Sequence, residues 1–211
     1  MGNVPRERIE YLFDKMATRE NMLDALYDVF TKALEKDLVI VYFALHGVPS
    51  EDELYFLPYE GDPRRLVSTG VAQSDLMKLI KSSRAKRIVM IIDACHAGKF
   101  GDMISAREIW TVRVANFLEE LSKTRPSVAV ISASSAGELS YEDAKWGNHG
   151  VFTYYLLRGL RGEADQDNDG YVRLRELYSY IYKKVHNATM GKQNPDIDGE
   201  FDNNLPLSIV R

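Results

Sequence analysis

Three short apolar runs dominate the hydrophobic pattern of the chain. Residues 38–45 (LVIVYFAL), 87–93 (RIVMIID) and 127–133 (SVAVISA) consist almost entirely of apolar side chains. Runs of this length that do not alternate with polar residues are typical of parallel strands covered on both faces. The sequence therefore predicts three buried strands.

Amphipathic segments stand before, between and after these strands. Residues 18–35 repeat apolar side chains at helical spacing, and Thr18 is placed to cap the start of a helix. Alternating strands and helices predict an α/β fold, built as a three-layer sandwich around a mostly parallel central sheet. The further segments with helical spacing are residues 74–80, 151–160 and 173–185.

Smaller elements complete the expected organisation. Residues 53–57 have the pattern of a hairpin arm, and residues 205–210 that of a final strand. The segment 99–126 is more charged and less regular than its surroundings, and a helix over 104–121 is predicted within it. Residues 99–126 are therefore expected to form an exposed connection.

Composition narrows the class of protein. The chain has 211 residues, of which 45% are hydrophobic, and we expect one domain over residues 1–211. A net charge of -4 gives no electrostatic reason to expect nucleic acid or an anionic membrane as a partner. No apolar run approaches the roughly 20 residues that span a bilayer, so a soluble protein is expected.

The single cysteine, Cys95, follows the apolar run 87–93. A lone cysteine forms no internal disulfide, and a reducing cytoplasm suits a working thiol. Cys95 has two interpretations at this point, a small buried side chain beside a turn or a nucleophile. Ligand crevices of open α/β sheets lie at the carboxyl ends of strands, so both interpretations stay open from this position alone.

A thiol nucleophile requires a base and an oxyanion site, and the strand over 38–45 provides candidates for both. His46 ends that run, so His46 and Cys95 would emerge at one edge of the sheet if the strands are parallel neighbours. The N–H groups of Gly47 and Cys95 could then bind a tetrahedral oxyanion. Capping or solvated roles are expected for the remaining histidines, namely His96, His149 and His186.

These motifs resemble the caspase-like cysteine peptidases, most of all bacterial caspase homologues and metacaspases. The resemblance rests on a strand that ends in His46-Gly47 and on a second strand that ends in the sequence DACHAG. His46 and Cys95 are 49 residues apart, against about 50 for the caspase pair. The resemblance implies a Cys-His dyad that cleaves peptide bonds, with a protein or peptide as substrate and an oligomeric state that the chain does not reveal.

The resemblance extends to the end of the chain. The run VAVISAS and the helix GVFTYYLLRGL match the small-subunit region of the family, and Gln193-Asn194-Pro195 resembles its Gln-x-Pro. It implies a large-subunit-like part over about 1–100, a connection over about 100–126 and a small-subunit-like part over about 127–211. The first apolar strand of the family is missing from residues 1–15, which indicates either a piece of a longer chain or a differently built sheet edge.

Asp93 is the candidate for substrate specificity. Caspases have glutamine two residues before the nucleophile, where it helps to bind an acidic substrate side chain, whereas this chain has Asp93. A carboxylate there would attract arginine or lysine, so we expect cleavage after basic residues. The alternative is that Asp93 only caps a turn. By the same resemblance, Ser132 and Ser134 would lie beside the substrate, which could pair with this segment as an added strand.

A second motif, DQDNDGYVRLRE over residues 165–176, has the complete pattern of a calcium-binding loop. Gly170 permits its sharp turn. The alternative is an acidic turn that caps the following helix without binding a metal ion. It stays open because calcium loops of this kind usually occur in pairs. The predicted oxygen ligands of calcium are Asp165, Asp167 and Asp169, the carbonyl of Tyr171, and Glu176 as a bidentate ligand.

Other functions remain open at this point. A calcium-responsive interaction module with the same fold and little or no turnover would also contain the loop, since a fold does not guarantee activity. A different thiol hydrolase or transpeptidase, such as a legumain-like enzyme, would also use a Cys-His pair. The leading hypothesis is the caspase-like endopeptidase, with calcium dependence as an additional expectation.

Overall fold

The structure is a computed structural model, and it describes residues 4–96, 116–117, 119–120, 127–135, 138, 141, 146 and 150–210, with only the backbone for residues 94–96. The helices are α1 (Arg19–Lys32), α2 (Leu66–Thr69), α3 (Gln73–Ser82), α5 (Val151–Arg158), the π-helical segment η4 (Gly159–Glu163) and α6 (Leu174–Ala188). The strands are β1 (Leu38–Pro49), β2 (Leu54–Leu57), β3 (Val71–Ala72), β4 (Arg87–His96), β5 (Val128–Ser132), β6 (Tyr171–Arg173), β7 (Asp196–Asp198) and β8 (Pro206–Ile209).

Six strands form a mixed central sheet in the order β3-β2-β1-β4-β5-β7. The three apolar runs form β1, β4 and β5, which pair in parallel at its centre. The shorter strands β2 and β7 run antiparallel to β1 and β5, respectively. The predicted α/β sheet is thus confirmed, with antiparallel strands added on either side of its parallel centre.

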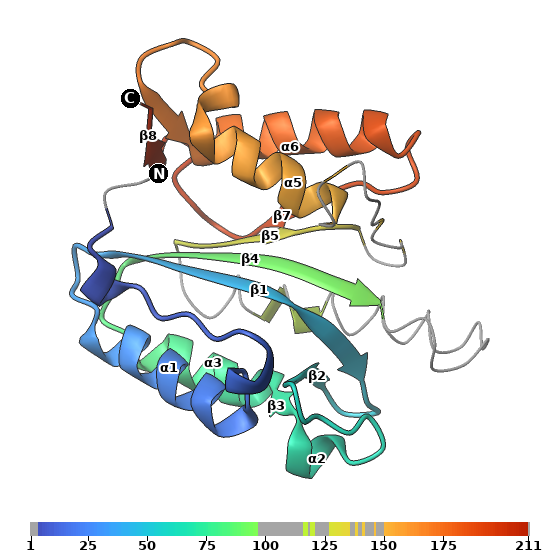
Figure 1. The fold of residues 1–211 in the computed structure, drawn as a ribbon. Helices are drawn as coiled ribbons and strands as arrows, with labels where there is room; N and C mark the ends of the chain where they lie inside the picture. Colours follow the sequence, from blue (N-terminus) through green and yellow to red (C-terminus); the bar gives the residue numbers. More distant parts are fainter. Residues whose placement is uncertain are drawn as a thin grey trace.

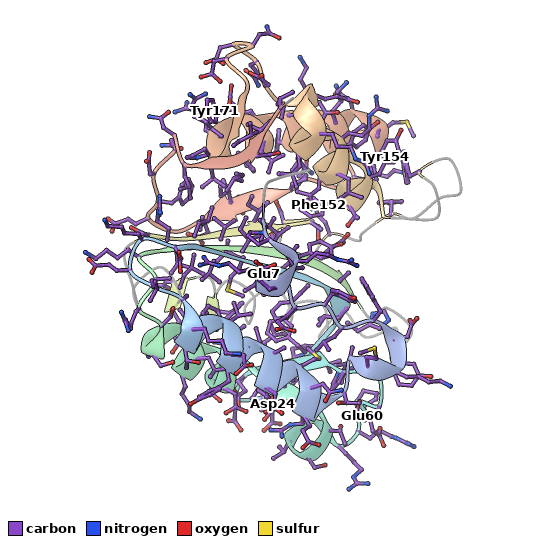
Figure 2. All side chains as sticks on the ribbon, turned by 60° about the vertical axis from the view of Figure 1, so that its left-hand side comes forward. Glu7, Asp24, Glu60, Phe152, Tyr154 and Tyr171 are labelled. Atoms are coloured by element: carbon purple, nitrogen blue, oxygen red, sulfur yellow. The ribbon has the colours of Figure 1, made fainter. Side chains whose placement is uncertain are left out.

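Helices cover the two faces of this sheet (Figure 1). Helices α1 and α3 lie on one face, and α5 and α6 lie on the other. Side chains of β4 and β5 enter the two cores alternately: Ile88 and Met90 pack with α1 and α3, whereas Val89 and Ile91 pack with α5 and α6. Phe152 of α5 points toward the sheet (Figure 2). The predicted three-layer sandwich is therefore confirmed.

Strand β1 differs from the prediction for residues 38–45, because only one of its faces is covered. Val39, Val41 and Phe43 are buried against α1 and α3, whereas Ile40 and Tyr42 on the other face are each 43% exposed. Among the described residues, no strand pairs with the second edge of residues 38–45, since β2 joins β1 only from His46 onward. The described residues before α1 contain two short 3-10 turns and no strand, in agreement with the missing first strand.

The helices predicted over 18–35, 74–80, 151–160 and 173–185 are present, with shifted ends. The hydroxyl of Thr18 accepts a hydrogen bond from the Asn21 N–H at 3.2 Å, so Thr18 caps α1 as expected. The helix predicted over 151–160 becomes η4 after Arg158, and it ends near Gly162, whose φ of 118° is not helical. The final strand also forms, but β8 pairs with β6 in a separate two-stranded sheet.

The expected helix over 104–121 and most of the connection over 99–126 lie outside the described residues. Within the described part of the chain, no helix combines the length and the apolar composition that crossing a membrane requires.

The core beneath β1 gives a first test of this fold. Phe30 of α1 is fully buried among residues of β1 and α3, whereas Tyr27 on the same helix is 57% exposed. We expect Phe30→Ala to lower the free energy of unfolding by about 3–5 kcal/mol, because it leaves a cavity in a packed core. Tyr27→Ala should change it by less than about 1 kcal/mol. Urea unfolding followed by circular dichroism measures both, and equal effects would contradict the packing of α1.

Candidate active site

The register of two parallel strands brings the predicted dyad together. In the pairing of β1 with β4, the Cα of His46 lies opposite the Cα of Cys95. Neighbouring strands lie about 4.8 Å apart, so these two residues are direct neighbours across the sheet. Both lie within their strands and not beyond them, because pairing continues to Gly47 and His96 and β2 extends β1 on the other side.

The predicted oxyanion site lies at the same place. Gly47 is buried between two partner strands, opposite Phe56 of β2 and His96 of β4. The backbone of residues 46–47 and 95–96 therefore forms one continuous piece of sheet. His46 is exposed next to it, where a substrate from solvent can reach the imidazole.

Asp93 lies two residues before Cys95 and is 7% exposed. The Thr153 hydroxyl of α5 donates a hydrogen bond to Asp93 Oδ2 at 2.5 Å, and the same hydroxyl lies 2.6 Å from the hydroxyl of Tyr42 on β1. A threonine hydroxyl has a single proton, so Tyr42 is the donor to Thr153. The three side chains form one hydrogen-bonded chain that fixes the position of the carboxylate.

Gly150 keeps space beside this carboxylate. It directly precedes α5, and a Cβ atom at position 150 would stand 3.3 Å from Asp93 Oδ2. That contact is tighter than nine in ten real Cβ contacts, so any larger residue would crowd the carboxylate. No local pattern points to Gly150 or to Tyr42, while Thr153 stands out only as a polar residue in a mainly apolar helix.

The two predicted substrate-binding serines are placed differently from Asp93. Ser132 lies opposite Ile92 in the register of β4 and β5, and strand alternation puts its side chain on the face of α1 and α3, away from Asp93. Its hydroxyl donates to the carbonyl of Ser134 at 3.2 Å. The structure thus brings Ser132 and Ser134 to each other but does not join Ser132 to the carboxylate.

The comparison with protein families adds a decisive observation to this geometry. The family model described as "Caspase domain" matches residues 8–205, which is most of the chain. The chain belongs to the caspase-domain family. Membership shows a peptidase-type domain, and it implies a hydrolase that acts on protein or peptide substrates.

A solved structure agrees with this family at the level of the fold. The crystal structure of protein GSU0716 from Geobacter sulfurreducens superposes with a TM-score of 0.58 and is 20% identical in sequence. The match covers 95% of this chain and 82% of that chain. No curated protein gave a significant match.

Gln193 holds together two segments, the end of β5 and the stretch that leads into α5. Its side chain is fully buried, donates to the carbonyl of Ala133 at 2.7 Å and accepts from the N–H of Tyr141 at 2.9 Å. Tyr141 in turn accepts from the N–H of Val151 at 2.9 Å, at the start of α5. The resemblance in sequence singled out Gln193 without a role, and its contacts tie the end of β5 to the start of α5.

The calcium-type loop lies elsewhere in the molecule. Carboxylate oxygens of Asp165, Asp167 and Asp169 lie within 4.8 Å of one another, whereas Glu176 binds the N–H groups of Gln166 and Arg173. The loop follows α5 and η4, so it lies at the other end of α5 from Gly150 and Asp93 (Figure 1). The structure therefore brings the three aspartates together away from the candidate active site.

The clamp by Gln193 is testable. We expect Gln193→Leu to lower the free energy of unfolding by about 2–6 kcal/mol, because the Ala133 carbonyl and the Tyr141 N–H each lose a partner at about 1–3 kcal/mol. Thermal unfolding measures the loss, with exposed Lys192→Leu as the neighbouring control. A melting temperature equal to that of the unchanged protein would refute the clamp.

Proposed function

We propose that the protein is a cysteine endopeptidase that cleaves after arginine or lysine. The observation that carries the proposal is the register of His46 opposite Cys95 in a caspase domain. In this mechanism the Cys95 thiolate attacks the substrate carbonyl, and His46 takes the thiol proton and returns it to the leaving amine. The N–H groups of Gly47 and Cys95 stabilise the oxyanion.

The preference for basic residues rests on Asp93. A carboxylate that is almost fully buried disfavours an acidic substrate side chain and gains strongly from a guanidinium or ammonium partner. The hydrogen bond from Thr153 supports a carboxylate held in place, and the missing side chain at Gly150 leaves its Oδ2 uncrowded. Thr153 and Tyr42 act in this proposal as positioning residues.

Turnover of short fluorogenic peptides tests the peptidase directly. Peptides with arginine or lysine before the cleaved bond should be hydrolysed, and peptides with aspartate there should not. We expect Cys95→Ala to lower kcat/KM by about 10⁴-fold or more and His46→Ala by about 10²–10⁴-fold, since each removes a partner of the reaction. Activity that survives Cys95→Ala would exclude this mechanism.

The role of Asp93 requires its own variants. We expect Asp93→Asn to lower kcat/KM for arginine and lysine peptides by about 10²-fold, because the charged partner of the substrate is lost. Thr153→Val, which removes only the hydroxyl, should raise KM by about tenfold with a smaller change in kcat. The control is Asp24→Asn, an exposed carboxylate of α1 in the other helical layer (Figure 2). An unchanged ratio of arginine to aspartate cleavage in Asp93→Asn would overturn the specificity.

The same assays separate the remaining hypotheses. Failure of an electrophilic arginine peptide to modify Cys95 would favour an interaction module, and transfer to an added amine would favour a transpeptidase. Each assay is run with calcium and with a chelator. Since the calcium-type loop lies at the far end of α5, we propose that calcium alters the stability of the enzyme and does not enter the chemistry.

A further inference from the structure

The aspartates of residues 165–169 have the spacing that a calcium ion requires. Calcium binds carboxylate and carbonyl oxygens at 2.3–2.6 Å, so oxygens on opposite sides of one ion are about 5 Å apart. One oxygen from each of Asp165, Asp167 and Asp169 falls within 4.8 Å of the others. A single ion could therefore contact all three without a large change in the loop.

Asp165 provides an independent sign of a ligand. Its Oδ2 accepts a hydrogen bond from the N–H of Gly170 at 3.1 Å. Its Oδ1 is buried and has no hydrogen-bond partner among the described residues. A buried carboxylate oxygen costs free energy unless it has a partner, and a cation in the loop would supply one.

Arg173 lies where a cation is needed. Its Nη2 bonds Asp169 Oδ2 at 2.5 Å, while its Nη1 is 3.8 Å from both Asp167 Oδ2 and Glu176 Oε2. That Nη1 is buried and, within the described part of the chain, forms no hydrogen bond. The guanidinium thus neutralises the carboxylates while its Nη1 is left without a hydrogen bond, which is the behaviour of a substitute for a better-fitting ion.

We propose that this loop binds one calcium ion and that Arg173 takes the place of the cation in the metal-free protein. Asp165, Asp167 and Asp169 supply carboxylate oxygens, and Tyr171 supplies its carbonyl. Calcium displaces the guanidinium, which already lies 5.8 Å from the centre of the exposed Tyr171 ring and can remain there. The site goes beyond the peptidase proposal and does not depend on it.

Glu176 moves in the same exchange. In the structure its two oxygens accept from the N–H of Arg173 at 2.9 Å and from the N–H of Gln166 at 3.2 Å. To bind calcium it gives up at least one of these bonds, and the ion compensates for the loss. Because Glu176 lies in the first turn of α6, calcium then joins the loop to this helix and favours the folded state.

Titration of calcium into chelator-treated protein tests the proposal, with isothermal calorimetry as the readout and Cys95→Ala as the background so that self-cleavage cannot interfere. We expect one site per chain and a melting temperature that rises with calcium. Arg173→Gln should bind calcium about tenfold more tightly, because it removes the competing cation. Asp167→Asn, at a side chain that is 61% exposed, should bind at least about tenfold more weakly.

Arg175→Gln is the matched control, because it makes the same change of charge two residues away at an exposed position of α6. It should bind calcium within about twofold of the parent protein, since a solvated charge is screened. No calcium binding by the parent and by Arg173→Gln would overturn the site. Equal affinities for Arg173→Gln and Arg175→Gln would overturn the role of Arg173. Because calorimetry requires no turnover, these outcomes are independent of peptidase activity.

Discussion

The parallel pairing of β1 with β4 is the interaction on which the fold and the candidate site both depend. It runs through ten register pairs, from Leu38 opposite Arg87 to Gly47 opposite His96. A shift by one residue would exchange the two faces of a strand, moving Val41 or Met90 out of the core beneath the sheet. Core packing therefore fixes the same register that puts His46 opposite Cys95.

The two strands of this pair are covered to different extents, and the candidate site lies at the boundary between the well-covered β4 and the partly exposed β1. From Ile88 to Asp93, β4 is buried on both faces, whereas β1 leaves Ile40 and Tyr42 partly exposed on the face of α5. A carboxylate in the fully buried strand needs a hydrogen-bond donor, and Thr153 of α5 supplies one to Asp93. The same region of the sheet thus contains the buried carboxylate of Asp93 and the solvent-exposed side chain of His46.

Much of this arrangement could be predicted from the sequence because the signals are local. Apolar runs identified β1, β4 and β5, and the residues at the ends of β1 and β4 predicted that His46 and Cys95 are neighbours. The continuation of both strands past the apolar runs could not be predicted, since it depends on pairing with β2 and on the β1–β4 register. Pairings between distant segments, such as β8 with β6, leave no local signal either.

Contacts of single side chains were the least predictable part. Thr153 and Asp93 are 60 residues apart, and Gln193 reaches Ala133 across the same separation. Each contact depends on how α5 and the end of β5 lie on the sheet, and an isolated Thr or Gln gives no sign of it. The role expected for Ser132 from the resemblance requires its side chain to lie on the same face of the sheet as Asp93. Only the register of β4 with β5 decides that face, and it puts Ser132 on the opposite one.

Helix α5 connects the candidate active site to the calcium-type loop. It begins beside Asp93 and leads through η4 to the acidic loop, and Glu163 joins this layer to α6 through bonds of 2.5 Å from Arg158 and from the Tyr180 hydroxyl. Burial raises the pKa of Glu163, but these two hydrogen bonds outweigh it and hold the pKa below its ordinary value. The ionised carboxylate stabilises this junction above its unfolded pKa, and that contribution is lost as the pH falls through the lower folded value. A cation bound in the loop would stabilise the same layer from its other end.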